Sequence, residues 1–228
     1  MEETDKITIH QVIWYLMIFS IIGLIIETLF CYVTTGVIES RKGLLYGPFC
    51  PIYGVGATFM IFILEPFKNN KIKLFVYGGI LGSVIEYIIS FGLEAFYGTR
   101  FWDYSIFPFN LNGRICITYT LFWGILAFLL IKIVKPLIDK IVNKTNYKLL
   151  DCAIVFFAVI DIFCTIWGIN VYRNRAINCY YGLDNYNKKS FINDIENNIF
   201  DNNKLQKTFP NMRFINENGK EIWIKDIL

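Results

Sequence analysis

Apolar residues gather into five long runs along the chain, and short polar segments separate them. A helix needs about 20 mostly apolar residues to cross the hydrocarbon core of a bilayer. We therefore expect an all-α fold, a polytopic helical membrane protein with about five transmembrane helices. The second run is the weakest of them, because Pro51 and Gly54 lie at its start and Glu65-Pro66 near its end. The helices are expected near residues 11–33, 51–67, 72–96, 114–135 and 149–171.

The C-terminal part of the chain differs from these runs in being polar. We expect residues 1–172 to form the transmembrane helical domain and residues 173–228, rich in Asn and Lys, to form a small tail. Asn218-Gly219 lies between two apolar stretches of the tail, which is typical of a β-hairpin. The tail is therefore expected to be a partly ordered appendage and not a catalytic domain. One weak helical stripe in it could form from Ile192, Ile195 and Ile199.

Composition supports a membrane protein and argues against several other classes. Hydrophobic residues make up 55% of the chain and charged residues 18%, whereas soluble domains carry about 25% charged residues. The net charge of +3 gives no support for nucleic-acid binding, which a clustered basic face would indicate. The chain has one histidine and no C-x-x-C pair among its six cysteines, so we expect no metal site and no cofactor. Cys50 and Cys116 could form a disulfide or remain two packed thiols.

The basic residues of the loops predict how the chain crosses the membrane. Nine lysines fall on one side of the five helices, and a smaller, mostly arginine set falls on the other. Cytoplasmic loops carry the excess of Lys and Arg, so we place the lysine-rich side in the cytoplasm. The chain then lies in a cell membrane with a cytoplasmic N-terminus. The first run is too long for a signal peptide and has no cleavage pattern, so we interpret it as a retained helix.

A glycine and a carboxylate occur four residues apart in two of the apolar runs. Gly23 precedes Glu27 in the first run, and Gly82 precedes Glu86 in the third. An ionisable group at the centre of a transmembrane helix costs at least about 2.5 kcal/mol, so two such groups indicate a site. The two helix–loop–helix units could be parallel repeats related by an axis along the membrane normal, although a short pattern can also recur by coincidence. The arginines that follow each glutamate after fourteen residues are Arg41 and Arg100.

We expect the intramembrane carboxylates and the polar loop residues to surround one cavity. The loop between the third and fourth runs is dense in aromatic and polar side chains, and irregular backbone survives at membrane depth only where it is buried in protein or lines a cavity. The alternative is that these groups only hold the helices together. The candidate binding residues are Glu27, Arg41, Lys42, Glu86, Arg100, Trp102, Asp103, Tyr104, Asn110, Asn112 and Arg114.

Three segments resemble the bacterial putative ABC-transporter type IV family, the CmpB-like permeases. They are Gly47–Gly54, Trp102–Ser105 and Phe109–Cys116, and the resemblance covers roughly residues 12–140. The chain departs from the family pattern in having Lys42 where Arg is expected and Leu24 where Trp is frequent. The resemblance implies a permease subunit that works with a separate ATPase. The chain itself has no G-x-x-x-x-G-K-[ST] phosphate-binding loop.

Three functions are compatible with the sequence. The favoured one is a transporter or permease component in the lipid bilayer with a polar cavity and a separate ATPase partner. A second is a membrane-embedded enzyme acting on a lipid or isoprenoid-linked substrate, with carboxylates as acid or base and arginines binding phosphate. A third is a structural membrane subunit. Without an ATP-binding motif the chain is not expected to be an enzyme, and it could form a homo-oligomer.

Overall fold

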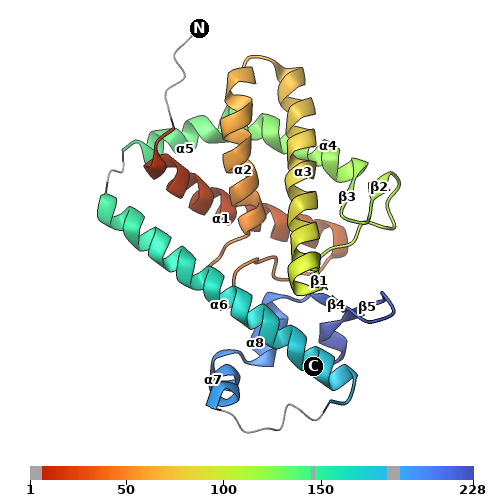
Figure 1. The fold of residues 1–228 in the computed structure, drawn as a ribbon. Coiled ribbons are helices and arrows are strands. Elements are labelled where there is room, and N and C mark those ends of the chain that lie inside the picture. Colours follow the sequence, from red (N-terminus) through yellow and green to blue (C-terminus); the bar gives the residue numbers. More distant parts are fainter. Residues whose placement is uncertain (1–6, 145–146, 184–190) are drawn as a thin grey trace.

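The computed structural model describes residues 7–144, 147–183 and 191–228. All five apolar runs are helical, which confirms the all-α membrane fold (Figure 1). Within the described residues, four helices are long and apolar enough to cross a membrane, and the second helix, spanning Pro51–Phe67, is shorter. The five are α1 (Ile9–Thr35), α2 (Pro51–Leu64) with its 3-10 extension η1 (Glu65–Phe67), α3 (Lys71–Tyr97), α4 (Ile117–Leu129) and α6 (Lys148–Tyr180).

Local sequence fixes the ends of the two glutamate-bearing helices. The Thr8 hydroxyl accepts a hydrogen bond from the backbone N–H of Gln11, whose side chain caps Thr8 in return, so α1 begins with a capping box. The Asn70 side chain caps α3 in the same position. Both helices end at a left-handed glycine, Gly36 with φ 74° and Gly98 with φ 56°. Glycine adopts this conformation without strain, so each helix stops where its loop must begin.

The fourth helix extends past its expected end at residue 135 and continues through Pro136. α4 continues through a π-helical segment, η2 (Leu130–Val134), into α5 (Lys135–Val142). Pro136 has no N–H to donate to the preceding turn, and a wider π turn accommodates that loss. The start differs too, because β3 (Ile115–Cys116) pairs with β2 (Asn110–Leu111) in a small hairpin that precedes the helix.

The helices pack in sequence order. α2 and α3 stand side by side, α1 and the α4–α5 helix cross them, and α6 runs along the outside of the bundle beside α1 (Figure 1). The main core lies between the first four helices and includes Tyr15, Met60, Leu74, Trp123 and Ala127.

The two glutamate-bearing units share one packing arrangement. In the first unit, α1 and α2 approach closely where Gly23 faces Tyr53: an added Cβ on this glycine would lie 2.1 Å from the Tyr53 Cβ. The Tyr53 hydroxyl then donates a hydrogen bond of 2.7 Å to Glu27, one turn further along α1. Gly23 therefore leaves space for Tyr53, which donates the hydrogen bond to Glu27.

The second unit repeats this arrangement with different residue types. A Cβ on Gly82 of α3 would lie 2.5 Å from the Trp123 ring of α4. Trp123 donates its indole N–H to Glu86 over 2.9 Å. The rings of Tyr53 and Trp123 meet with their centroids 5.4 Å apart, so the two units join at these residues. The recurrence of glycine, aromatic donor and carboxylate in space supports the repeat over a coincidence.

Further pairs of positions match between the units. Gly54 lies against the Leu16 carbonyl, and Gly124 lies against the Phe75 carbonyl. Glu65-Pro66 ends α2, and Lys135-Pro136 occupies the corresponding place in the fourth helix. These two charged residues contact each other, with the Lys135 Nζ 3.6 Å from a Glu65 carboxylate oxygen. The two units therefore contact each other through equivalent residues both at Tyr53–Trp123 and at Glu65–Lys135.

The described part of the tail is folded and joined to the helical domain. β4 (Arg213–Ile215) and β5 (Glu221–Trp223) form the expected hairpin around Gly219, and β1 (Thr99–Arg100) pairs with β4 to complete a three-stranded sheet. The tail also contains α7 (Phe191–Ile199), α8 (Asn202–Thr208) and the 3-10 turn η4 (Ile224–Asp226). These residues of the expected appendage are ordered, and residues 184–190 lie outside the described part of the chain.

The fifth helix passes both its expected end at residue 171 and the expected domain boundary at residue 172. Its last two turns are held by the tail: the buried Arg175 donates to the Phe200 carbonyl and, over 2.7 Å, to the Asn202 side chain. Tyr172 and Ala176 are buried against the tail core. A polar sequence continues as helix here because tertiary contacts cover it.

We predict that Gly82→Ala destabilises the protein. The new methyl group would overlap the Trp123 ring, and overpacking of this kind costs about 1–3 kcal/mol. Thermal unfolding of the purified protein in detergent, followed by size-exclusion chromatography, measures the effect. Gly92→Ala is the matched control, because it lies in the same helix with no atom within 4 Å of the new Cβ. Equal melting temperatures for the two variants would contradict the close-approach role of Gly82.

We also predict that Glu221→Gln loosens the tail. Glu221 accepts hydrogen bonds from Arg100 over 2.8 Å and from Arg213 over 2.6 Å, so it ties β5 to the loop after α3. Hydrogen bonds to charged groups contribute about 1.5–3 kcal/mol, less where water reaches them. Limited trypsin digestion should release the tail several-fold faster than from the parent protein. The exposed carboxylate of Glu217 provides the control, and Glu217→Gln should leave the cleavage rate unchanged.

Candidate functional site

A cavity of about 530 Å³ lies where the two units, their loops and the tail meet. Glu27 and Cys31 of α1, Glu86 of α3 and Tyr119 of α4 line it from the helices. The loop after α1 contributes residues 40–43, and the loop after α3 contributes Phe101, Trp102 and Tyr104. The tail closes one side with Thr208, Phe209, Pro210 and Asn211.

Glu86 is buried and fully provided with hydrogen-bond donors. One carboxylate oxygen accepts from the Tyr104 hydroxyl over 2.8 Å, and the other accepts from the Trp123 indole over 2.9 Å. Both donors are neutral. Burial, and then the adjacent Glu86 carboxylate, raise the pKa of Tyr104 well above its usual value, so this phenol keeps the proton it donates.

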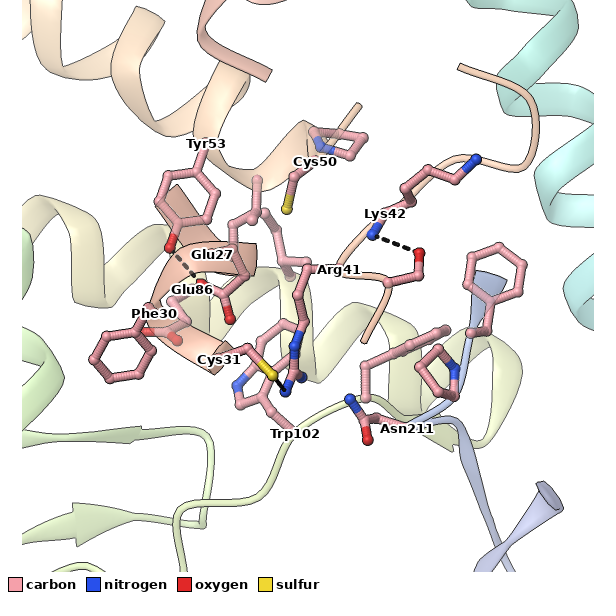
Figure 2. Close-up of a pocket in the computed structure, with 18 of the residues that line it drawn as sticks. Glu27, Phe30, Cys31, Arg41, Lys42, Cys50, Tyr53, Glu86, Trp102 and Asn211 are labelled. Carbon is pink, nitrogen blue, oxygen red and sulfur yellow. Dashed lines mark hydrogen bonds between the residues drawn. The ribbon is translucent and has the colours of Figure 1, made fainter. Parts of the chain in front are cut away.

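Glu27 has fewer partners than Glu86. Its Oε2 accepts from the Tyr53 hydroxyl, and its side chain is half-buried at the cavity wall (Figure 2). Among the residues that the structure describes, no ion pair joins Glu27 or Glu86 to a basic side chain. The two carboxylates therefore rely on neutral aromatic donors and not on the arginines that the sequence spacing paired with them.

Aromatic rings surround the two carboxylates. Tyr104 stacks on Tyr119 with ring centroids 4.5 Å apart. Phe30 contacts Tyr119 edge-on at 6.2 Å and Phe122 at 5.7 Å. All four line the cavity together with Tyr53 and Trp123. Of these residues, Tyr53, Tyr104 and Trp123 donate hydrogen bonds to the two carboxylates. Ring faces carry the negative part of the aromatic quadrupole.

Arg41 supplies a positive charge to the same cavity. Its Nη2 lies 2.8 Å from the Cys31 sulfur and 3.8 Å from a Glu39 oxygen, and its Nε is buried without a hydrogen-bond partner. Burial opposes the charge, but contact with Cys31 and the field of Glu27 outweigh it and raise the pKa of Arg41. Figure 2 shows the guanidinium beside Cys31, whereas the Lys42 side chain runs away from Glu27.

Six of the eleven predicted residues line this cavity: Glu27, Arg41, Lys42, Glu86, Trp102 and Tyr104. Trp102 is positioned by its indole N–H, which donates to the Arg114 carbonyl over 3.1 Å. The structure thus brings the two carboxylates into one site with one of the two spaced arginines. The proposed roles of these residues in binding remain predictions.

The other two predicted arginines bind a carboxylate outside the cavity. Arg100 lies 2.6 Å from Glu94, and Arg114 lies 2.7 Å from the same oxygen. The equal spacing of Arg100 from Glu86 therefore does not correspond to an ion pair, because Glu94, two turns further along α3, is nearer to the loop. The contact with Glu94, together with Glu221, raises the pKa of Arg100 and keeps it charged.

The remaining predicted residues shape the loop after α3. The Asp103 carboxylate accepts from the backbone and hydroxyl of Ser105; burial opposes its charge, but these bonds and the charges of Arg213 and Arg100 lower its pKa. Asn110 donates to the Phe107 carbonyl over 2.9 Å. The final member, Asn112, adopts a positive φ of 55° in the β2–β3 turn and donates to the Tyr87 hydroxyl.

Sequence reasoning missed several residues of the site. Tyr53 and Trp123 lie inside apolar runs and looked like ordinary core residues, although each heads an aromatic–glycine pair at the same place in its unit. Nothing in the sequence indicates that the tail residues 208–211 line the cavity, because they reach it only through the pairing of the tail sheet with the loop after α3. Within the described residues, no cluster of His, Cys, Asp and Glu could hold a metal ion.

Cys50 and Cys116 are both buried free thiols. We predict that Cys50 reacts slowly with maleimides although it lines the cavity. Burial, together with the charge of Glu27, raises the pKa of Cys50 to about 12, and the reactive species is the thiolate. At pH 7.5 its labelling should be at least about 100-fold slower than that of the exposed Cys179 in the same sample, measured by peptide mass spectrometry. The rate at Cys50 should still rise with pH at pH 10. A rate that levels off near pH 9 would contradict this environment.

Comparison with known proteins places the chain in one family. Residues 14–166 match the family model described as putative ABC-transporter type IV. The matched segment contains α1 from residue 14 onward, α2 to α5 and the first part of α6, with every predicted site residue, and ends before the tail. No curated protein and no solved structure matches the chain. Because the match covers well over half of the sequence, the chain belongs to the putative ABC-transporter type IV family.

Proposed function

We propose that this protein is the membrane-embedded, substrate-binding component of a transporter and that its substrate occupies the cavity between the two helical units. The observation that carries the proposal is the joint presence of Glu27, Glu86 and Arg41 around about 530 Å³ of space. Ionisable groups at membrane depth are costly and mark functional sites by default.

The size and position of the cavity support substrate binding. Small-molecule sites have volumes of about 300–1,000 Å³ and combine mostly apolar walls with a few polar groups. In transporters built from internal repeats, substrate sites lie at the interface between the repeats. Here the Tyr53–Trp123 contact joins the two units beside the cavity. Membership in a putative ABC-transporter family agrees with this arrangement.

A separate ATPase would supply the energy, because this sequence has no phosphate-binding loop. We place its docking surface at the lysine-rich end of the helices. The contact between Lys135 and Glu65 holds the α2–α3 and α5 segments together at this end. The exposed lysines there are Lys71, Lys73, Lys132, Lys140, Lys144 and Lys148. Their charge also favours the cytoplasmic side of the membrane.

A membrane-embedded enzyme is the second candidate. Two carboxylates and an arginine in one cavity could act as acid, base and phosphate ligand on a lipid-linked substrate. This function requires turnover by the purified chain alone, and that turnover should be lost in Glu86→Gln. A transport component requires a partner instead, which separates the two proposals experimentally.

We predict that the tagged chain, purified from its native membrane in mild detergent, carries a nucleotide-binding ATPase in near-stoichiometric amount. Lys140→Glu combined with Lys144→Glu should reduce the recovered ATPase several-fold, because charge reversal disrupts the docking surface. Lys220→Glu, an exposed lysine of the tail hairpin, is the matched control and should recover the parent amount.

Cavity variants separate docking from transport. Glu86→Gln should keep the ATPase bound, because Glu86 lies in the cavity and not at the lysine-rich end. Recovery of a folded chain with no ATPase would overturn the transporter proposal, and turnover by that chain alone would favour the enzyme.

A further inference from the structure

We infer that the cavity takes a zwitterionic ligand, with an ammonium group bound between Glu27 and the aromatic rings and a phosphate or carboxylate group bound by Arg41. The inference rests on the proposed function, since it assumes that the cavity is the substrate site. It adds the chemical class of the substrate, which the family match does not provide.

The first step is the difference between the two carboxylates. Both oxygens of Glu86 accept a hydrogen bond from a protein donor. Glu27 accepts from Tyr53 through Oε2, and its Oε1 has no hydrogen bond within the described part of the chain. Because Glu27 lines the cavity, this oxygen is available to a ligand. The hydrogen bonds of Glu86 therefore hold the protein together, and Glu27 is the carboxylate that binds the ammonium group of the ligand.

The second step is the unused hydrogen-bonding capacity of Arg41. A guanidinium offers five N–H donors. In Arg41 one nitrogen contacts the Cys31 sulfur at 2.8 Å, and the closest carboxylate, Glu39, is 3.8 Å away. Arg100, by contrast, has carboxylate oxygens at 2.6 and 2.8 Å. Arg41 thus keeps donors for a bidentate contact with a phosphate or carboxylate.

The third step is the separation of the two charges. Glu27 and Arg41 line the same cavity but form no ion pair within 4.0 Å. A ligand with only one charge would compensate one of them and leave the other without an opposite charge inside the cavity, which is unfavourable for a partly buried group. A ligand that carries both charges satisfies both groups at once.

The fourth step is the aromatic surface beside Glu27. Ammonium and guanidinium cations bind over the faces of aromatic rings, and quaternary ammonium groups are recognised by aromatic cages. Phe30, Tyr119 and Phe122 form a contiguous set of rings at the cavity wall next to Glu27. An alkylated ammonium fits this wall better than a metal ion, whose ligands would be several oxygens.

The test measures binding to the full-length chain in a maltoside detergent, by calorimetry and by intrinsic tryptophan fluorescence, to which Trp102 and Trp123 at the cavity contribute. The probes are phosphocholine and glycine betaine, with choline and inorganic phosphate as their separate halves. At least one zwitterion should bind ten-fold or more tightly than choline or phosphate alone. This comparison uses the parent protein, so it does not depend on any variant folding. Equal affinity for choline alone or for phosphate alone would overturn the inference, as would no binding of either zwitterion.

Two variants test the assignment of each charge. Glu27→Gln should weaken zwitterion binding ten-fold or more and remove the preference for phosphocholine over phosphate. Arg41→Gln should weaken it similarly and remove the preference for phosphocholine over choline. Glu217→Gln and Lys220→Gln, at exposed positions of the tail hairpin, are the matched controls. Parent affinity in both cavity variants would contradict the proposed contacts.

A lipid headgroup and a free solute share this chemistry, and a short-chain lipid distinguishes them. Tighter binding of dihexanoylphosphocholine than of phosphocholine identifies a lipid substrate, and equal binding identifies a soluble one; both support the zwitterion. The proposed function is judged separately by recovery of the ATPase. A chain that carries its ATPase but binds no zwitterion refutes only the ligand class, and a chain that binds the zwitterion without an ATPase refutes only the transporter.

Discussion

The fold depends on how two carboxylates are accommodated inside a helical bundle. Each needs hydrogen-bond donors from the protein, because the hydrocarbon core of a membrane provides none. Tyr53 and Trp123 supply them from the neighbouring helix, and they reach the carboxylates only because a glycine lies opposite each ring. This geometry fixes how closely α1 approaches α2 and how closely α3 approaches α4. The contact between the two aromatic rings then sets the two units against each other.

The two units differ in the connection between the carboxylate and its aromatic donor, which borders the cavity. The carboxylate and its aromatic donor are 26 residues apart in the first unit and 37 apart in the second. The longer connection contains the β2–β3 hairpin and the segment that delivers Tyr104 to Glu86. The shorter connection delivers Arg41 to the cavity and gives Glu27 no second donor. Two similar helical units therefore form an asymmetric site. Both oxygens of Glu86 accept hydrogen bonds from the protein, whereas only one oxygen of Glu27 does so among the described residues.

The sequence predicts the helices well because a membrane span must be apolar over its whole length, whatever its neighbours are. It also locates the carboxylates, since Glu27 and Glu86 are conspicuous in apolar runs. It does not predict partners, because spacing along the chain does not measure distance in space. Arg100 bonds to Glu94 and to Glu221, which is more than one hundred residues away. The sequence does not predict the end of α6 for the same reason, because its buried Arg175 bonds to the backbone and side chains of the tail.

The tail places a wall of this cavity outside the part of the chain that the family model matches. The match ends at residue 166, and the wall residues beyond it are Ile169, Thr208, Phe209, Pro210 and Asn211. The matched part supplies both carboxylates, Arg41 and the aromatic rings, so it contains every charged group that lines the site. The tail adds apolar surface and two neutral polar side chains. The charged groups of the cavity therefore lie in the part of the chain that the family model matches, and the tail contributes to the shape of its wall.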